Sequence, residues 1–177
     1  MRALMVGAVG VLGALCLSSS AMAQSRNKIT INLYNKADHS FGLHDVASSP
    51  SAKSWNWSPE TVRPGGTGIF SGYWDDNQGQ SVTVEVQGMT PGPYGCLVSC
   101  AVTVNMPLYE ATSDGLKCPT DVSKVKYSFR TTSNNNVCGN VTCKVDPDHG
   151  GWPTLDQNCN YTLNTKFTNP NRLGQED

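Results

Sequence analysis

The chain has 177 residues, of which 38% are hydrophobic and 15% charged, with 13 basic and 14 acidic side chains. This length suits a single domain with a sizeable core, and the near balance of charge, without a basic stripe, argues against a nucleic-acid partner. Gly, Pro, Asn, Ser and Thr are abundant, and no stretch has helical periodicity.

Residues 1–23 have the pattern of a cleaved signal peptide. Arg2 supplies the only charge before residues 3–17, which are apolar or glycine and too few to span a bilayer as a mature helix. Ala21 and Ala23 then place small residues at the two positions that a signal peptidase recognises before its cleavage site. The sequence predicts a mature protein that starts at Gln24, is secreted or periplasmic, and is not membrane-spanning.

The mature chain alternates short β-patterned segments with turns. Alternation is clearest in residues 28–34, where Ile29, Ile31 and Leu33 are expected to point inward. The other segments with strand character are residues 41–45, 54–57, 69–73, 80–86, 97–104, 125–129, 137–145 and 161–167.

This rhythm predicts an all-β fold, an antiparallel β-sandwich of roughly eight to ten short strands. We expect one domain over residues 24–168, with a surface loop at residues 46–53, which are rich in Ser, Pro and Ala. The polar residues 169–177 are expected to form a flexible tail.

Six cysteines follow the signal peptide, an even number that predicts three disulfides in an exported chain. The sequence does not choose among the pairings. These cysteines are Cys96, Cys100, Cys118, Cys138, Cys143 and Cys159. All of them lie after residue 95, so the C-terminal half is expected to be disulfide-stabilised and the N-terminal half to be held by packing alone.

Local geometry restricts two of these pairings. In an extended segment Cys96 and Cys100 would lie about 13 Å apart, beyond disulfide reach, so each should bridge elsewhere. Gly139-Asn140 has the composition of a hairpin turn, which would allow Cys138 and Cys143 to bond. Zinc ligation is not expected, because CxxC pairs are absent.

Aromatic residues beside loops are the candidate ligand contacts. Trp55 and Trp57 would share one face of an extended segment, and Tyr73 and Trp74 precede an acidic turn. Trp152 also stands beside a loop, after a pair of glycines. Tryptophan and tyrosine suit sugar faces and membrane interfaces because one end is apolar and the other polar. The predicted ligand-binding set is Trp55, Trp57, Tyr73 and Trp74; the alternative places Trp55 and Trp57 in the core.

The sequence contains no recognisable catalytic motif. HExxH, GxSxG, P-loop and GxGxxG patterns are absent, so no catalytic residue is assigned and no cofactor is expected. His39 and His44 are five positions apart, an odd number, and would face opposite sides of one strand. The acidic turns at residues 75–77 and 146–151 lack the spacing of a calcium loop, so no metal site is predicted.

Part of the N-terminal half resembles the first half of the aegerolysins. The resemblance runs from the segment Ile29–Asn35, through Phe41-Gly42 and Trp57, to Pro64–Trp74. Aegerolysins are small β-sandwich proteins that bind particular membrane lipids. The likeness therefore implies a sandwich fold and a lipid or glycan surface as ligand. The signal peptide and the cysteine-rich C-terminal half depart from that family, and no binding residue is carried over.

These observations predict an exported, non-catalytic binding module that recognises a lipid, glycan or envelope surface. One alternative is a periplasmic or secreted inhibitor or immunity-type protein with a protein partner. Another is a small exported hydrolase that uses His39, His44 or His149.

Overall fold

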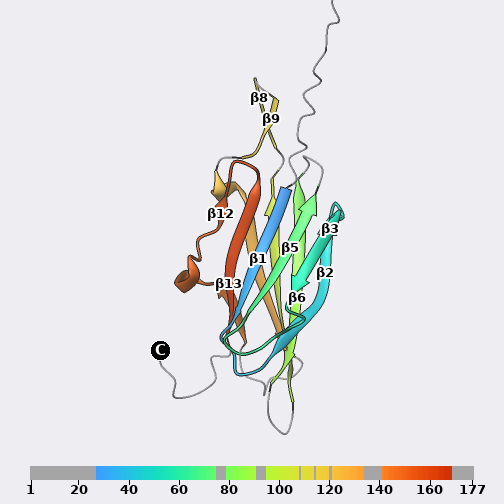
Figure 1. Ribbon diagram of the computed structural model, residues 1–177, viewed down its shortest axis with the longest axis vertical. Coiled ribbons are helices and arrows are strands. Elements are labelled where there is room, and N and C mark those ends of the chain that lie inside the picture. The colour runs from blue at the N-terminus through green and yellow to red at the C-terminus, as the bar shows by residue number, and fades with distance from the viewer. Residues whose placement is uncertain are drawn as a thin grey trace, which may run out of the picture.

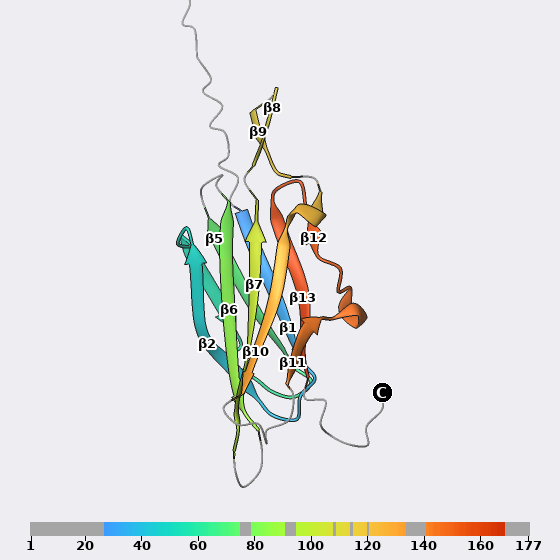
Figure 2. The ribbon, with the colours of Figure 1, turned by 180° about the vertical axis from the view of Figure 1, so that it is seen from behind.

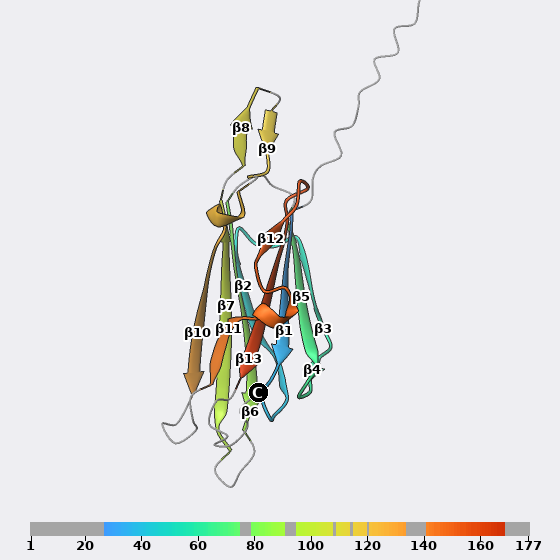
Figure 3. The same ribbon diagram turned by 90° about the vertical axis from the view of Figure 1, so that its left-hand side faces the viewer.

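The protein is a β-sandwich in which two sheets pack face to face (Figures 1 and 3). The predicted signal peptide, the predicted tail, the acidic turn at residues 75–77, Cys16 and Cys138 lie outside the residues that the structure describes. The computed structural model describes residues 27–74, 79–90, 95–107, 109–113, 115–119, 121–133 and 141–168.

The first sheet has the strand order β11-β13-β1-β5-β3, and β12 pairs with β13. Its strands are β1 (Asn27–Asn35), β3 (Ser54–Ser58), β5 (Thr67–Trp74), β11 (Thr142–Val145), β12 (Thr154–Leu155) and β13 (Asn160–Thr168). The second sheet has the order β10-β7-β6-β2-β4. Its strands are β2 (Phe41–Ser49), β4 (Thr61–Val62), β6 (Gln80–Met89), β7 (Leu97–Met106) and β10 (Lys126–Ser133).

A small hairpin and two short helical turns complete the described structure. The hairpin of β8 (Glu110–Thr112) and β9 (Gly115–Lys117) extends beyond one end of the sandwich (Figures 1 and 2). The 3-10 turns are η1 (Val122–Lys124) and η2 (Pro147–His149). Among the described residues, no helix has the length and hydropathy needed to cross a membrane.

The core forms where the alternating apolar residues of the two sheets meet. In β1, Ile29, Ile31 and Leu33 are fully buried, as the sequence predicts. Their partners in the opposite sheet are the equally buried valines of β6 and β7, which are Val82, Val84, Val86, Val98, Val102 and Val104. A strand has a side-chain period of two, so one apolar face per sheet is enough to define this core.

The predicted antiparallel sandwich is confirmed, with one exception in strand direction. β1 pairs with β13 in parallel, because Ile29 lies opposite Tyr161 and Asn35 opposite Phe167. The described part of the chain contains thirteen strands rather than roughly eight to ten. The excess comes from strands of two or three residues: β4 and β12 at sheet edges, and β8 and β9 in their own hairpin. Segments this short are too brief to show an alternating pattern in the sequence.

The prediction for residues 46–53 is partly wrong, since β2 continues to Ser49 as a partner of β6. A β-bulge between Leu43 and Asp45 shifts the register, so that Val46 lies opposite Val84. The extra residue resets the alternation, which explains why Asp45 is exposed while Val46 is half-buried against the core.

Disulfide bonds join segments that are distant in sequence. Cys100 of β7 bonds Cys143 of β11 and thereby links the two sheets, while Cys118 bonds Cys159. Cys96 is disulfide-bonded as well, so Cys96 and Cys100 do bridge elsewhere as expected. The suggested pairing of Cys143 with Cys138 is wrong, because β11 lies beside β7 and brings Cys143 to Cys100.

Candidate functional site

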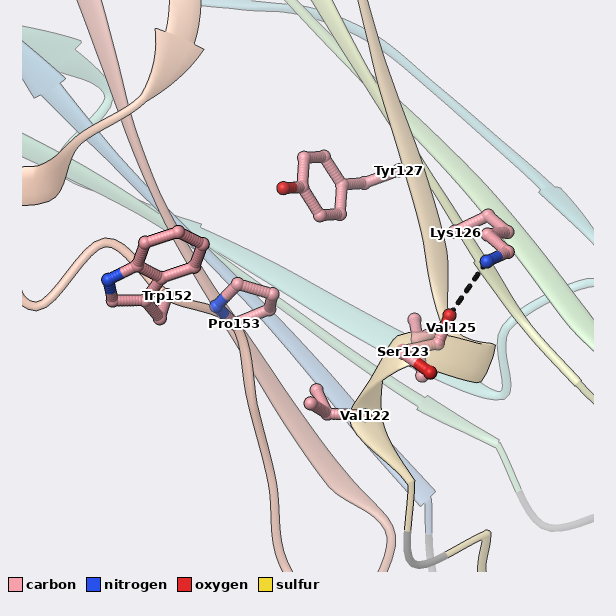
Figure 4. Close-up of a pocket in the computed structure, with 7 residues that line it drawn as sticks. All are labelled: Val122, Ser123, Val125, Lys126, Tyr127, Trp152 and Pro153. Atoms are coloured by element: carbon pink, nitrogen blue, oxygen red, sulfur yellow. Dashed lines mark hydrogen bonds between the residues drawn. The ribbon is translucent and has the colours of Figure 1, made fainter.

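An apolar cleft opens at the edge of the sandwich where β10 faces the loop before β12. Its volume is about 370 Å³ (Figure 4). Trp152 and Pro153 lie on one side, and η1 and the start of β10 lie on the other. The lining residues are Val122, Ser123, Val125, Lys126, Tyr127, Trp152 and Pro153.

The first wall comes from the inward face of an edge strand. Tyr127 and Phe129 of β10 lie opposite Val104 and Val102 of β7, which are buried, so both rings point toward the first sheet. The ring of Tyr127 meets that of Phe129 edge-on, with centroids 5.9 Å apart. Because β10 is the last strand of its sheet, Tyr127 remains partly exposed at the opening.

The η1 turn extends this wall. The side chain of Asp121 caps the turn by accepting a hydrogen bond of 2.9 Å from the Ser123 N–H. The Nζ of Lys126 donates to the Ser123 carbonyl at 2.8 Å, and Lys124 pairs with Glu110 of the hairpin. These contacts hold the aliphatic residue Val122 at the cleft.

The second wall begins with a turn organised by a buried carboxylate. The side chain of Asp146 accepts from the Asp148 N–H at 3.1 Å and contacts His149 Nδ1 at 2.7 Å. Lys166 Nζ lies 3.7 Å from the same carboxylate. Burial raises the pKa of Asp146, but the His149 and Asp148 hydrogen bonds and the charge of Lys166 outweigh it and leave this pKa below its ordinary value. The carboxylate is thus held ionised inside the turn, where the His149 ring also stacks on Tyr34 with centroids 3.9 Å apart.

Two glycines then direct the chain to Trp152. Gly150 has a φ of 70°, the left-handed conformation that ends η2, and its carbonyl accepts a hydrogen bond from Asn164. A Cβ at Gly151 would lie 1.9 Å from the Asp146 carbonyl oxygen, so only glycine fits there. The turn presents Trp152 with 82% of its surface exposed.

The Cys118–Cys159 disulfide joins the two walls. Cys118 precedes η1, and Cys159 lies between β12 and β13. The carboxylate of Asp156 accepts from the N–H groups of Asn158 and Asn160 and from the Asn160 side chain. Burial raises the pKa of Asp156, and these hydrogen bonds outweigh it and lower that pKa overall. The backbone around Cys159 is thereby fixed, including its unusual φ of 60°.

The buried Tyr161 lies near Tyr127 but does not line the cleft. Tyr161 of β13 lies opposite Leu155 of β12, two residues after Pro153. The side chain of Tyr161 is fully buried between the sheets. Its hydroxyl has no hydrogen-bond partner among the described residues. Burial raises the pKa of the Tyr161 phenol, and the neighbouring Tyr127 raises it further.

The predicted aromatic set lies at the opposite edge of the sandwich, and the four residues differ in exposure. Trp55 is 50% exposed and stacks on Phe70, with centroids 6.4 Å apart. Trp57 is half-buried against the core, and Tyr73 is half-buried beneath the Lys28 ammonium. Trp74 is only 1% exposed and donates from Nε1 to the Pro50 carbonyl. Trp74 is therefore a core residue rather than a surface contact, because its position in β5 faces the second sheet.

The histidines occupy three different settings. His39 is buried with its Nδ1 3.0 Å from Asp38, His44 is exposed at the bulge of β2, and His149 contacts Asp146. Among the described residues, no group of three or more His, Cys, Asp or Glu side chains is arranged to hold a metal ion.

The predicted contact set omits Tyr127 and Trp152, although both carry sequence signals. Tyr127 belongs to an alternating segment with Val125 and Phe129, and Trp152 follows two glycines and precedes a proline. Each signal concerns only neighbouring residues. The cleft forms because β10 and the loop before β12, which belong to different sheets, lie at adjacent edges, and no local pattern predicts that arrangement.

No known family model matches the chain, and no curated protein matches it.

Proposed function

We propose that this protein is an exported, non-catalytic binding module that recognises a lipid, glycan or envelope surface through the cleft beside Trp152. The observation that carries the proposal is the combination of an apolar cleft with a nearly fully exposed tryptophan on its rim. A large exposed ring beside an apolar hollow is typical of a binding site, because both lose unfavourable contact with water when a ligand covers them.

The construction of the rim supports this function. Trp152 follows a turn in which a buried carboxylate, a left-handed glycine and a close backbone contact leave little freedom. The opposite wall is tied to it by the Cys118–Cys159 bond. A rigid site loses less conformational entropy when it binds, so its contacts contribute more fully to affinity.

Export is part of the same proposal. The pattern of residues 1–23 and the disulfides both suit a secreted or periplasmic protein. Intact-mass measurement of the secreted protein should give an N-terminus at Gln24. A cytoplasmic product that retains Met1 would contradict export.

Binding is tested by sedimentation with liposomes and with isolated cell-envelope material, together with a glycan array. The variant is Trp152→Ala, and the matched control is Trp55→Ala, which removes the exposed tryptophan of the opposite edge. We expect binding to be lost in the first variant and kept in the second. Retention of binding in Trp152→Ala would overturn the assignment of the cleft.

A further inference from the structure

The two walls of the cleft each offer an aromatic ring to whatever enters it. Trp152 comes from the loop before β12 and Tyr127 from β10, and the Tyr127 hydroxyl points toward the Trp152 side (Figure 4). A pyranose ring carries C–H groups on its faces and hydroxyls around its rim. Aromatic faces therefore pack against the sugar faces, while phenol and indole polar groups bond the rim.

Charge in the cleft favours a neutral ligand. Among the described lining residues there is no carboxylate, and the single ammonium, that of Lys126, already donates to the Ser123 carbonyl. An anionic lipid surface is usually bound by a cluster of basic side chains, which this lining does not contain.

Size points in the same direction. A volume of about 370 Å³ lies near the lower end of the range for small-molecule sites, roughly 300–1,000 Å³. This space suits one or two sugar rings. From these observations we infer that the cleft binds a neutral sugar unit of a glycan, held between Trp152 and Tyr127. The inference rests on the proposed function and specifies its ligand.

The experiment uses the disulfide-bonded mature protein and two kinds of probe. Neutral hexose and N-acetylhexosamine oligosaccharides are titrated by calorimetry, and phosphatidylcholine and phosphatidylglycerol vesicles are tested by sedimentation. We expect a neutral oligosaccharide to bind and the vesicles not to bind. Trp152→Ala should weaken sugar binding at least about tenfold. The affinity of Trp152→Phe should stay within about threefold of the parent value, and Trp55→Ala should leave the affinity unchanged.

The remaining outcomes separate the two proposals. Vesicle binding that depends on Trp152, with no sugar binding, would overturn the sugar inference and leave the binding module standing. Capture of neither probe would overturn the sugar inference, and failure of envelope material to bind as well would overturn the proposed function.

Discussion

Gly151 determines where the exposed tryptophan at the cleft can lie. Its backbone passes so close to the Asp146 carbonyl that a side chain of any size would force the two apart. Gly150, one residue earlier, is constrained only by its left-handed backbone. The two adjacent glycines are therefore needed for different physical reasons.

Alanine substitution at each glycine distinguishes the steric constraint at Gly151 from the backbone constraint at Gly150. Gly151→Ala should lower the free energy of unfolding by about 3 kcal/mol, because the new methyl group overlaps the backbone. Gly150→Ala should cost about 1 kcal/mol, which is the strain of a left-handed alanine. Chemical denaturation of both variants measures the difference. Equal costs would show that the turn relaxes around residue 151.

Trp55 and Trp57 share one face of β3 but differ in depth. Trp57 lies over Gly68 and beside Val62 of β4, whereas Trp55 lies opposite Gly72 and stacks on Phe70 at the open edge. The covering strand β4 contains only Thr61 and Val62, so it shields little of this edge.

This difference in depth predicts different costs of truncation. Trp57→Ala should lower the free energy of unfolding by about 3 kcal/mol, because it leaves a cavity against the core. Trp55→Ala should cost about 1 kcal/mol, since half of that side chain is already in water. One denaturation curve for each variant is sufficient. Equal costs would mean that the two rings are equally buried in solution.

At the scale of elements, the η2 turn depends on the ionised carboxylate of Asp146. The pKa of Asp146 in the folded protein lies below its ordinary value, because hydrogen bonds and charges outweigh the opposing effect of burial. A lowered folded pKa means that the stabilisation is present above the unfolded pKa, about 4, and is lost as the pH falls through the folded pKa.

Asp146→Asn should therefore lower the free energy of unfolding by about 1–3 kcal/mol at neutral pH. The gap in unfolding free energy between the variant and the parent protein should narrow as the pH falls below about 4, the unfolded pKa, and through the lower folded pKa of Asp146. Thermal unfolding across a pH series measures both curves. A gap that is independent of pH would show that the charge of Asp146 contributes nothing.

For the whole molecule, the Cys100–Cys143 bond is a disulfide that links the two sheets. Its cysteines are separated by 43 residues, so the bond restricts a long loop of the unfolded chain. The Cys118–Cys159 bond closes a loop of similar length, with a separation of 41 residues, at the cleft. The two bonds should stabilise the fold by similar amounts and differ in their local effects.

Double replacement by alanine tests this expectation. Each double variant should lose about 2–4 kcal/mol of unfolding free energy relative to the parent protein. Loss of Cys118–Cys159 should also weaken ligand binding at the cleft, whereas loss of Cys100–Cys143 should leave affinity for the ligand nearly unchanged. Thiol labelling of the native parent provides the control, since no described cysteine should react. Equal ligand affinity in both double variants would show that the Cys118–Cys159 bond does not contribute to the binding cleft.

Much of the fold could be predicted from the sequence, because the rules involved act over a few residues. The period of two in β1 and β6 identifies which side chains face the core, and those residues are buried. The same rule fails in β2, where a bulge changes the alternation without a clear sequence signal. The alternation rule also gives only the face on which an aromatic side chain lies and not its depth, so it could not distinguish the exposed Trp55 on the edge strand β3 from the buried Trp74 on β5.

The sequence alone determined the all-β class, the two inward faces and the exclusion of a Cys96–Cys100 bond, since each follows from the covalent geometry of neighbouring residues. Only the tertiary structure decided that Cys143 bonds Cys100, that Trp74 is buried, and that Tyr127 and Trp152 line one cleft. Each of these depends on which strands lie side by side. Strand order is set by packing between segments far apart in the chain, and no local pattern specifies it.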